Sequence, residues 1–208
     1  MKSAIVLASQ SPRRRALLAA LGVAFTVDAA DVDETPRPGE LPLDLVMRLS
    51  REKALSVAAR RPGATVLAAD TIVVLDGAIL GKPAGADEAT AMLQALKGRT
   101  HQVLTAVSVA RDDALVARCS ACDVTMRAYS DDEIDAYVAT GDPLDKAGAY
   151  AIQHPTFAPV ARWTGCYTSI MGLPLGVVAD LLASMGEAIP ADVAGICEPL
   201  GGRCCLRT

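Results

Sequence analysis

A single long apolar run constrains this chain more than any other feature. Residues 64–75 hold eleven uncharged side chains, most of them Val, Ile, Leu, Ala or Thr, and one acid, Asp70. Such a run is typical of a buried central strand. The pair Asp76-Gly77 then predicts a tight hairpin, with residues 78–80 as its short return strand. We therefore expect this run to form the middle of a sheet.

The rest of the chain alternates strand-like and helix-like segments. Ser11 and Pro12 form a helix cap and a first-turn proline, and Ser130 precedes an acidic first turn that suits a helix N-terminus. We predict strands at 4–8, 101–111, 114–129 and 167–171, and helices at 12–21, 43–60, 87–97, 131–140 and 174–185. Residues 28–42, which are acidic and Pro-rich, and residues 142–165 are predicted to be mostly irregular. This alternation predicts an α/β fold with a mixed sheet, whose ligands bind in the loops after strands.

Composition and charge limit the partners. Hydrophobic residues make up 51% of the 208 residues but aromatic residues only 3%, so the core must be aliphatic. The net charge of −4 argues against a nucleic-acid polymer as partner, and the few aromatics argue against base-stacking platforms. A small anionic ligand fits this balance only if cations are concentrated locally.

No segment suggests export or membrane insertion. The apolar run at residues 4–8 is too short for a signal peptide, and no run approaches the ~18 residues of a membrane span. We therefore expect a cytoplasmic protein without a membrane partner. The six cysteines suggest no metal site, since Cys119 and Cys122 should face opposite sides of a strand and the tail cysteines lack a matching CxxC.

Two charged side chains interrupt apolar patterns. Asp70 is the only charge in its predicted strand, and a buried carboxylate is costly unless it is paired, hydrogen-bonded or bound to metal. It could act as a general base, or it could satisfy a bend in the strand. Lys53 follows Leu45 and Leu49 on one apolar row of a predicted helix. It could point into a cleft, or its stem could lie along the apolar row with the ammonium in solvent.

A cluster of anion-binding side chains stands at the first strand-to-helix junction. Ser9 and Ser11 precede three consecutive arginines, of which Arg13 and Arg14 lie in the first helical turn. Arginines oppose the helix dipole there, whereas an anion between them and the free N–H groups would be stabilised. The alternative is an ordinary capped helix with a solvated arginine face.

Two later segments carry weaker signals. Lys82 lies between Gly81 and Pro83, directly after the hairpin, which brings it back to the sheet region of Asp70. Gln153 follows an apolar pair and looks buried. Such a glutamine could read a base edge with its paired donor and acceptor, or it could be a satisfied core amide.

Several enzyme classes lack their motifs. His101 and His154 are not spaced as a metal pair, and neither supports a catalytic triad. The chain has no GxGxxG, GxxxxGK[ST] or GxSxG motif. Dinucleotide enzymes, P-loop NTPases and α/β-hydrolases are therefore disfavoured.

The motifs are specific when they are taken together. They are Leu7-Ala8-Ser9-Gln10-Ser11-Pro12-Arg13-Arg14, Ser50-Arg51-Glu52-Lys53-Ala54, Ala69-Asp70-Thr71-Ile72-Val73, Gly81-Lys82-Pro83, residues 145–153, and Gly172-Leu173-Pro174-Leu175. In this order and spacing they resemble the Maf family of nucleoside triphosphate pyrophosphatases over residues 3–186. We predict one domain, residues 1–186, and a Cys-containing tail, residues 187–208.

The resemblance implies a fold and a reaction. The fold is similar to that of inosine triphosphatases: an elongated mixed β-sheet flanked by helices, with two lobes around a cleft. The reaction is the hydrolysis of a nucleoside triphosphate to the monophosphate and pyrophosphate with Mg²⁺ or Mn²⁺. The family also suggests a homodimer.

The resemblance assigns roles residue by residue. Asp70 matches the proposed general base, and Asp70 with Glu34 would hold the metal. The positions that handle phosphate match Ser9, Arg13, Arg14, Lys53 and Lys82. Arg13, Thr71 and Gln153 match the specificity positions of the branch that prefers dTTP and UTP.

One departure from the family pattern lies beside the predicted site. Gln153 is followed by His154-Pro155 where a glycine is often found. Two other functions stay open: a nucleotide-binding regulator of cell division and septum formation without turnover, and a phosphatase that releases orthophosphate. A base candidate together with several cations favours an enzyme.

Overall fold

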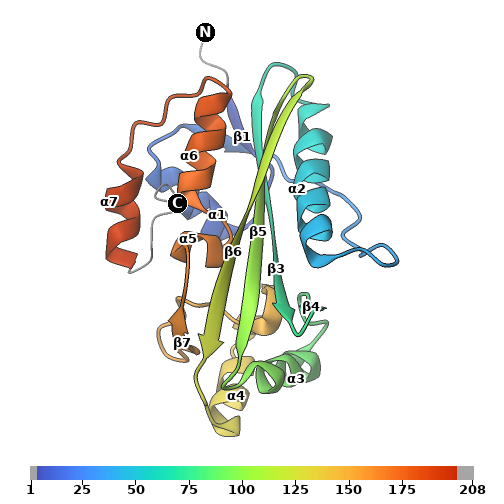
Figure 1. Ribbon diagram of the computed structural model, residues 1–208, viewed down its shortest axis with the longest axis vertical. Helices are drawn as coiled ribbons and strands as arrows, with labels where there is room; N and C mark the ends of the chain where they lie inside the picture. Colours follow the sequence, from blue (N-terminus) through green and yellow to red (C-terminus); the bar gives the residue numbers. More distant parts are fainter. Residues whose placement is uncertain (1–3, 201–208) are drawn as a thin grey trace.

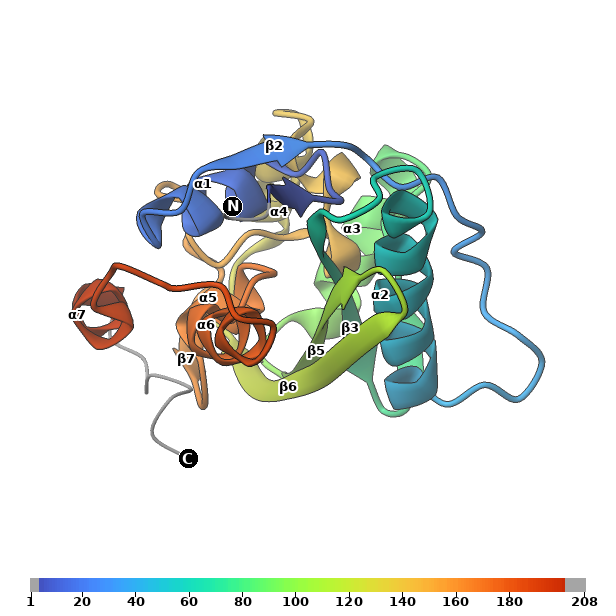
Figure 2. The same ribbon diagram turned by 90° about the horizontal axis from the view of Figure 1, so that it is seen from above.

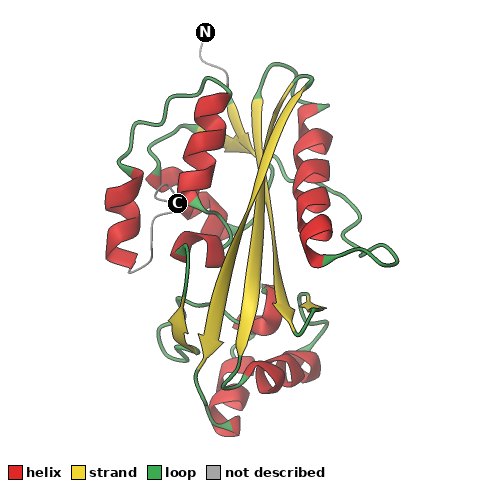
Figure 3. Cartoon of the chain, viewed as in Figure 1, coloured by secondary structure: helices red, strands yellow, loops and turns green. Residues whose placement is uncertain are grey.

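The protein is elongated around one mixed sheet that runs along its long axis. The computed structural model describes residues 4–200 (Figure 1). The strands lie in the order β2-β1-β3-β5-β6-β7, and β4 also pairs with β3. Helices flank the sheet on both faces (Figures 1 and 3). The predicted α/β class, with an elongated mixed sheet flanked by helices, is confirmed.

The secondary structure follows the expected order. The strands are β1 Ile5–Leu7, β2 Phe25–Val27, β3 Thr65–Leu75, β4 Ala78–Leu80, β5 Thr100–Arg111, β6 Ala114–Met126 and β7 Val160–Trp163. The α-helices are α1 Pro12–Ala20, α2 Pro42–Ala58, α3 Ala86–Leu96, α4 Asp131–Val138, α5 Tyr167–Ile170, α6 Leu175–Ser184 and α7 Val193–Cys197. Three short 3-10 helices span Asp142–Asp145, Ala147–Ala149 and Glu198–Leu200.

One predicted strand is wrong. Residues 167–171 form a helical turn, α5, in which the carbonyl of Tyr167 accepts from the N–H of Met171. The Thr168 hydroxyl oxygen accepts from the N–H of Leu175 at 3.1 Å, a side-chain bond that favours a turn over a strand. The short strands β2 and β7 were not predicted.

An opening in the sheet lies at the middle of β3. Along one edge, β3 pairs with β5 from Val66 to Val74. The other edge is shared, since β1 pairs with residues 65–67 and β4 with residues 73–75. Within the described chain, residues 68–72 therefore have no strand partner on this edge. The ends of β1 and β4 bring the segments after them, residues 8–14 and 81–83, to the same opening.

The apolar core divides at the same point on both faces of β3. Odd-numbered residues face one way: Leu67 and Ala69 pack with α1 and α6, while Val73 and Leu75 pack with α3 and α4. Even-numbered residues face α2, where two clusters lie on either side of position 70. Helices α2 and α6 lie on opposite sides of the sheet (Figure 2). Asp70 and Thr71 thus occupy the polar boundary between four apolar clusters.

The tail begins inside the fold. Glu187 is buried and accepts a hydrogen bond from the Thr65 hydroxyl at 2.7 Å. Val193 and Cys197 pack into the cluster of α1 and α6. Cys204 and Cys205 lie outside the described residues. Within residues 4–200, the structure has no helix with the length and hydropathy that a membrane span needs.

Candidate active site

The opening beside β3 leads into a cleft of about 900 Å³. Its lining includes every residue that the sequence singled out for the site: Ser9, Arg13, Arg14, Glu34, Lys53, Asp70, Thr71, Lys82 and Gln153. These residues come from the helix α1 junction, the loop before α2, α2 itself, β3, the loop after β4 and the segment before β7. The fold therefore brings six separate segments to one cavity.

The centre of the cleft is a lysine shared by two carboxylates. The Lys53 Nζ lies 2.5 Å from Asp70 Oδ1 and 2.6 Å from Glu34 Oε1. Lys53 and Asp70 are buried, whereas about half of the Glu34 side chain is exposed. Lys53 thus points into the cleft rather than to solvent. The other Asp70 oxygen, Oδ2, makes no hydrogen bond to any part of the chain that the structure describes.

The charges around Glu34 keep it ionised. Partial burial raises the pKa of its carboxyl, but the hydrogen bond from Lys53 and the positive charges of Lys53, Lys82 and Arg14 outweigh that effect. The net result is a lowered pKa. Glu34 is therefore available as an anionic ligand or partner at neutral pH.

Arg14 is held by a chain of hydrogen bonds. Its guanidinium donates to the Gly172 carbonyl at 2.9 Å, to Thr71 Oγ1 at 3.1 Å and to Ser9 Oγ at 3.4 Å. The Thr105 hydroxyl donates to the Ser169 carbonyl, so the Thr71 hydroxyl donates to Thr105 Oγ1 at 3.0 Å. Burial lowers the pKa of Arg14, while the charge of Asp70 opposes that shift.

Gly172 fits this arrangement because of its backbone. Its φ is +102°, and an added Cβ would lie 3.3 Å from Thr71 Oγ1 and 3.5 Å from Arg14 Nε. A side chain here would strain the backbone and crowd Arg14. Thr105 and the Gly172 carbonyl were not predicted as part of the site, although the β3–β5 register places Thr105 directly opposite Thr71.

Two cations of the cleft lining are available to a ligand. In the part of the chain that the structure describes, the side chains of Arg13 and Lys82 make neither a hydrogen bond nor an ion pair. Arg15, the third arginine of the run, is exposed and is not part of the lining. Of the three arginines, Arg14 is therefore held by hydrogen bonds, Arg13 is available to a ligand, and Arg15 lies outside the cleft.

Gln153 is not buried as the sequence suggested. It is exposed and lines the cleft, because residues 151–155 turn after the buried Ala151. His154, the departure from the family pattern, closes this turn: its Nδ1 accepts from the N–H of Phe157 at 3.0 Å, and its ring lies edge-on to Tyr137. The amide of Gln153 is therefore free to meet a ligand.

The lining carries a small excess of positive charge. Its five cations are Arg13, Arg14, Lys53, Lys82 and Lys146, and its four acids are Asp31, Glu34, Asp70 and Asp145. Lys146 is already paired with Asp142 and Asp145, at 2.9 and 2.6 Å. The local positive charge that the sequence predicted is therefore small and is concentrated on Arg13 and Lys82.

The donors suit a divalent cation that also binds a ligand. In the described part of the chain, no three His, Cys, Asp or Glu side chains form a metal-binding group. Glu34 and Asp70 supply two carboxylates that approach a common point, the Lys53 ammonium. Mg²⁺ commonly binds one or two carboxylates together with phosphate oxygens and water. The residues therefore fit such an ion, provided that the substrate completes its shell.

The chain is similar to several known proteins. The family model described as Maf-like protein matches residues 4–185. A protein of Thermomicrobium roseum named dTTP/UTP pyrophosphatase is 48% identical, over 97% of this chain and 93% of the relative. One of Myxococcus xanthus with the same name is 53% identical, over 89% and 94%. A solved HAM1 protein from Coxiella burnetii aligns with a TM-score of 0.43 at 19% identity, covering 62% of this chain and 75% of that one.

Proposed function

Because this chain belongs to the family of Maf-like proteins, we propose that it hydrolyses dTTP and UTP to the monophosphate and pyrophosphate. One observation carries the proposal. A single cleft combines the Asp70 carboxylate of a strand, the lysine that pairs with one of its oxygens, and two cations whose side chains make no hydrogen bond or ion pair to the described residues. A base and anion-binding groups in one cavity are what the hydrolysis of a phosphoanhydride needs.

The contacts of each cleft residue indicate its role in the reaction. Arg13 and Lys82 are free to pair with the phosphate oxygens of the substrate. Arg14 is fixed by Gly172, Ser9 and Thr71, so it offers a preorganised positive charge. Asp70 accepts the proton of the attacking water at Oδ2, while Lys53 holds Oδ1.

Charge balance supports a metal ion in the reaction. A triphosphate carries about four negative charges near neutral pH, whereas the cleft lining has one positive charge in excess. When bound to Asp70 and Glu34, Mg²⁺ or Mn²⁺ would supply positive charge that stabilises the phosphate oxygens as the bond breaks. The pairing of Lys53 with both acids holds their side chains in place.

The pyrimidine nucleobase of the substrate would meet Gln153 and Arg13. The exposed amide of Gln153 has the paired donor and acceptor that a pyrimidine edge needs. Thr71 has its hydroxyl committed to Arg14 and Thr105, so we infer that it acts on the substrate through Arg14. Homodimer formation and a cytoplasmic location stay predictions.

A nucleotide panel with product identification tests the function. Purified protein with Mg²⁺ or Mn²⁺ is expected to convert dTTP and UTP to the monophosphate and pyrophosphate in equal amounts. A diphosphate with orthophosphate would indicate a phosphatase. Saturable binding without turnover of any nucleotide would indicate the regulator, and either result would contradict the proposal.

The variant Asp70→Asn tests the assignment of the base. Loss of one general base costs about 10²–10⁴-fold in turnover. We expect a loss in that range for dTTP, with nucleotide binding retained. Asp180→Asn, the same change in an exposed ion pair with Arg118 outside the cleft, is the matched control and should keep full activity. A folded Asp70→Asn protein with near wild-type turnover would show that another group is the base.

A further inference from the structure

The loop that delivers Glu34 has little apolar packing of its own. Residues 28–41 connect β2 to α2 without a helix or strand, and residues 33–39 are all exposed. An exposed loop of this length costs conformational entropy to hold in one shape. Yet Glu34 lies within 2.6 Å of Lys53. Polar contacts must therefore keep it there.

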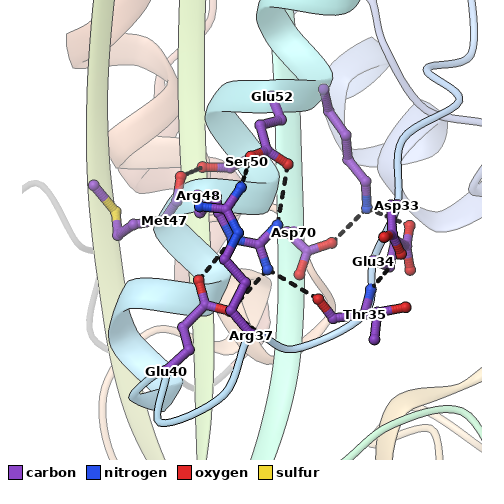
Figure 4. A network of polar contacts seen from close by, with 11 residues as sticks. Asp33, Glu34, Thr35, Arg37, Glu40, Met47, Arg48, Ser50, Glu52 and Asp70 are labelled. Atoms are coloured by element: carbon purple, nitrogen blue, oxygen red, sulfur yellow. Dashed lines mark hydrogen bonds and ion pairs between the residues drawn. The ribbon is translucent and has the colours of Figure 1, made fainter.

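Arg48 of α2 makes three of these contacts, all in the second half of the loop (Figure 4). Its Nε and Nη2 lie 2.6 and 2.8 Å from the two carboxylate oxygens of Glu40, a bidentate pair. Its Nη2 also donates to the Thr35 carbonyl at 3.1 Å. Its Nη1 pairs with Glu52 Oε2 at 3.1 Å, one turn along the same helix. One guanidinium thus contacts the loop at two points and is itself fixed to α2.

The rest of the network closes around the same loop. Glu40 Oε2 accepts from the N–H of Arg37 at 3.0 Å, and the Arg37 side chain pairs with Glu52 Oε1 at 3.0 Å. Asp33 Oδ1 accepts from the N–H of Thr35 at 2.9 Å. Glu34 is therefore the middle residue of a turn, and Arg48 holds the carbonyl of the next residue, Thr35.

The ion pair of Arg48 and Glu40 is largely shielded from solvent. The Arg48 and Glu40 side chains are only 13% and 9% exposed, although they join a surface loop to a helix. The hydrogen bonds from Arg48 lower the pKa of Glu40 to about 2, so Glu40 is ionised near neutral pH. Only arginine has the fork that can hold a carboxylate with two bonds and still reach a carbonyl.

We propose that Arg48 is a positioning residue that holds Glu34 against the Lys53–Asp70 pair and so prepares the cleft for the metal-bound triphosphate. This inference rests on the proposed function. Arg48 is absent from the cleft lining, so it acts only through the loop. Residues that orient a metal ligand in this way typically change metal affinity or activity by about 10–100-fold when they are replaced.

The test replaces Arg48 by lysine, which keeps the charge and removes the fork. We expect kcat/KM for dTTP to fall roughly tenfold and the Mg²⁺ concentration for half-maximal rate to rise. Arg118→Lys makes the same change in the exposed Arg118–Asp180 pair and should alter neither value. A merely structural role for Arg48 would not move the Mg²⁺ dependence.

A double-mutant cycle shows whether the effect passes through Glu34. In a Glu34→Gln background, Arg48→Lys should change kcat/KM by less than about twofold, because the group that it positions is already lost. An equal fold-loss in both backgrounds, or no loss in either, would overturn the proposal.

Hydrogen exchange separates this proposal from the proposed function. Arg48→Lys should speed amide exchange in residues 33–41, and Arg118→Lys should not. Faster exchange with unchanged dTTP kinetics would overturn the positioning role and leave the function standing. A wild-type protein that hydrolyses no nucleotide would overturn both, even if the exchange result shows that Arg48 holds the loop.

Discussion

Two irregular segments bring residues to the cleft, and they are held by different forces. The loop of residues 28–41, which carries Glu34, is held by arginines. Arg48 of α2 binds the second half of the loop, and Arg60 and Arg61, just after α2, bind Asp28 at its start. The segment of residues 142–157, which carries Gln153, packs into the apolar core through Ala149, Tyr150 and Phe157. Charge therefore holds the loop of Glu34, whereas aromatic packing holds the segment of Gln153.

We expect the two segments to contribute differently to stability and to activity. Replacing a residue that packs in the core should unfold the protein before it changes the chemistry. Replacing a surface ion pair should change the geometry of the site while the domain stays folded. We therefore expect the two segments to respond differently to mutation, pH and salt, as measured by the free energy of unfolding and by amide exchange.

The largest expected effect is on the aromatic side. Phe157 is buried, and its ring stacks on that of Tyr137. The centroid of the Phe157 ring lies 4.4 Å from that of Tyr137 and 4.9 Å from that of Tyr129. Phe157→Ala should lower the free energy of unfolding by about 3–5 kcal/mol, measured by urea denaturation. Arg48→Lys should lower it far less. Equal losses in the two variants would remove the contrast between the segments.

A smaller effect should appear with pH. His101 is buried behind the aromatic segment: its Nε2 lies 2.8 Å from the Tyr150 hydroxyl, and its Nδ1 is buried without a hydrogen-bond partner. Burial lowers the pKa of His101 to about 4 from its ordinary 6.5. Between these values the unfolded chain binds the proton and the folded chain does not, so stability falls as the pH drops from 6.5 toward 4.

The size of that effect can be measured in a non-titrating variant. Between pH 7 and pH 5, His101 should contribute a loss of about 2 kcal/mol in the free energy of unfolding. His101→Gln can still hydrogen-bond Tyr150 but cannot titrate, so it should lose this part of the pH dependence. The charge-held loop should not respond in this range, since the pKa values of Asp28 and Glu40 are both about 2. An unchanged pH profile in His101→Gln would contradict the assignment.

The smallest effect should come from salt. Arg60 and Arg61 pair with Asp28 at 2.7 Å each, and both arginines are exposed. In about 1 M NaCl the screening length falls to roughly 3 Å, so amide exchange in residues 28–32 should rise by roughly two- to fivefold. Exchange in residues 147–157 should stay the same. A rise in both segments would mean that salt loosens the whole domain.

The sequence predicted the long elements and missed the short strands β2 and β7 for one reason. The eleven residues of β3 and the seventeen of α2 display their patterns fully, whereas β2 has three residues and β7 four. Pairing with β1 and β6, rather than local preference, makes those short segments strands. Residues 167–171 were wrongly predicted as a strand because the bond that favours their turn, from the N–H of Leu175 to the Thr168 hydroxyl, comes from the helix that follows.

The site was predictable where a charge broke an apolar pattern. Asp70 and Lys53 each interrupt such a pattern, and each lies at the boundary between apolar clusters. Glu34 has no such context and came from family resemblance alone. The role of Arg48 could not be predicted, because the helix pattern shows only Glu52 four residues on, while Glu40 and Thr35 reach it through an irregular loop.

In the proposed hydrolysis of dTTP to the monophosphate and pyrophosphate, we infer that water attacks the phosphorus next to the sugar, so that pyrophosphate leaves. Hydrolysis of dTTP in water labelled with heavy oxygen, followed by mass spectrometry of both products, tests this directly. We expect the label to enter the monophosphate and pyrophosphate to carry none. Label in pyrophosphate, or in released orthophosphate, would place the attack on a different phosphorus and contradict the proposed reaction.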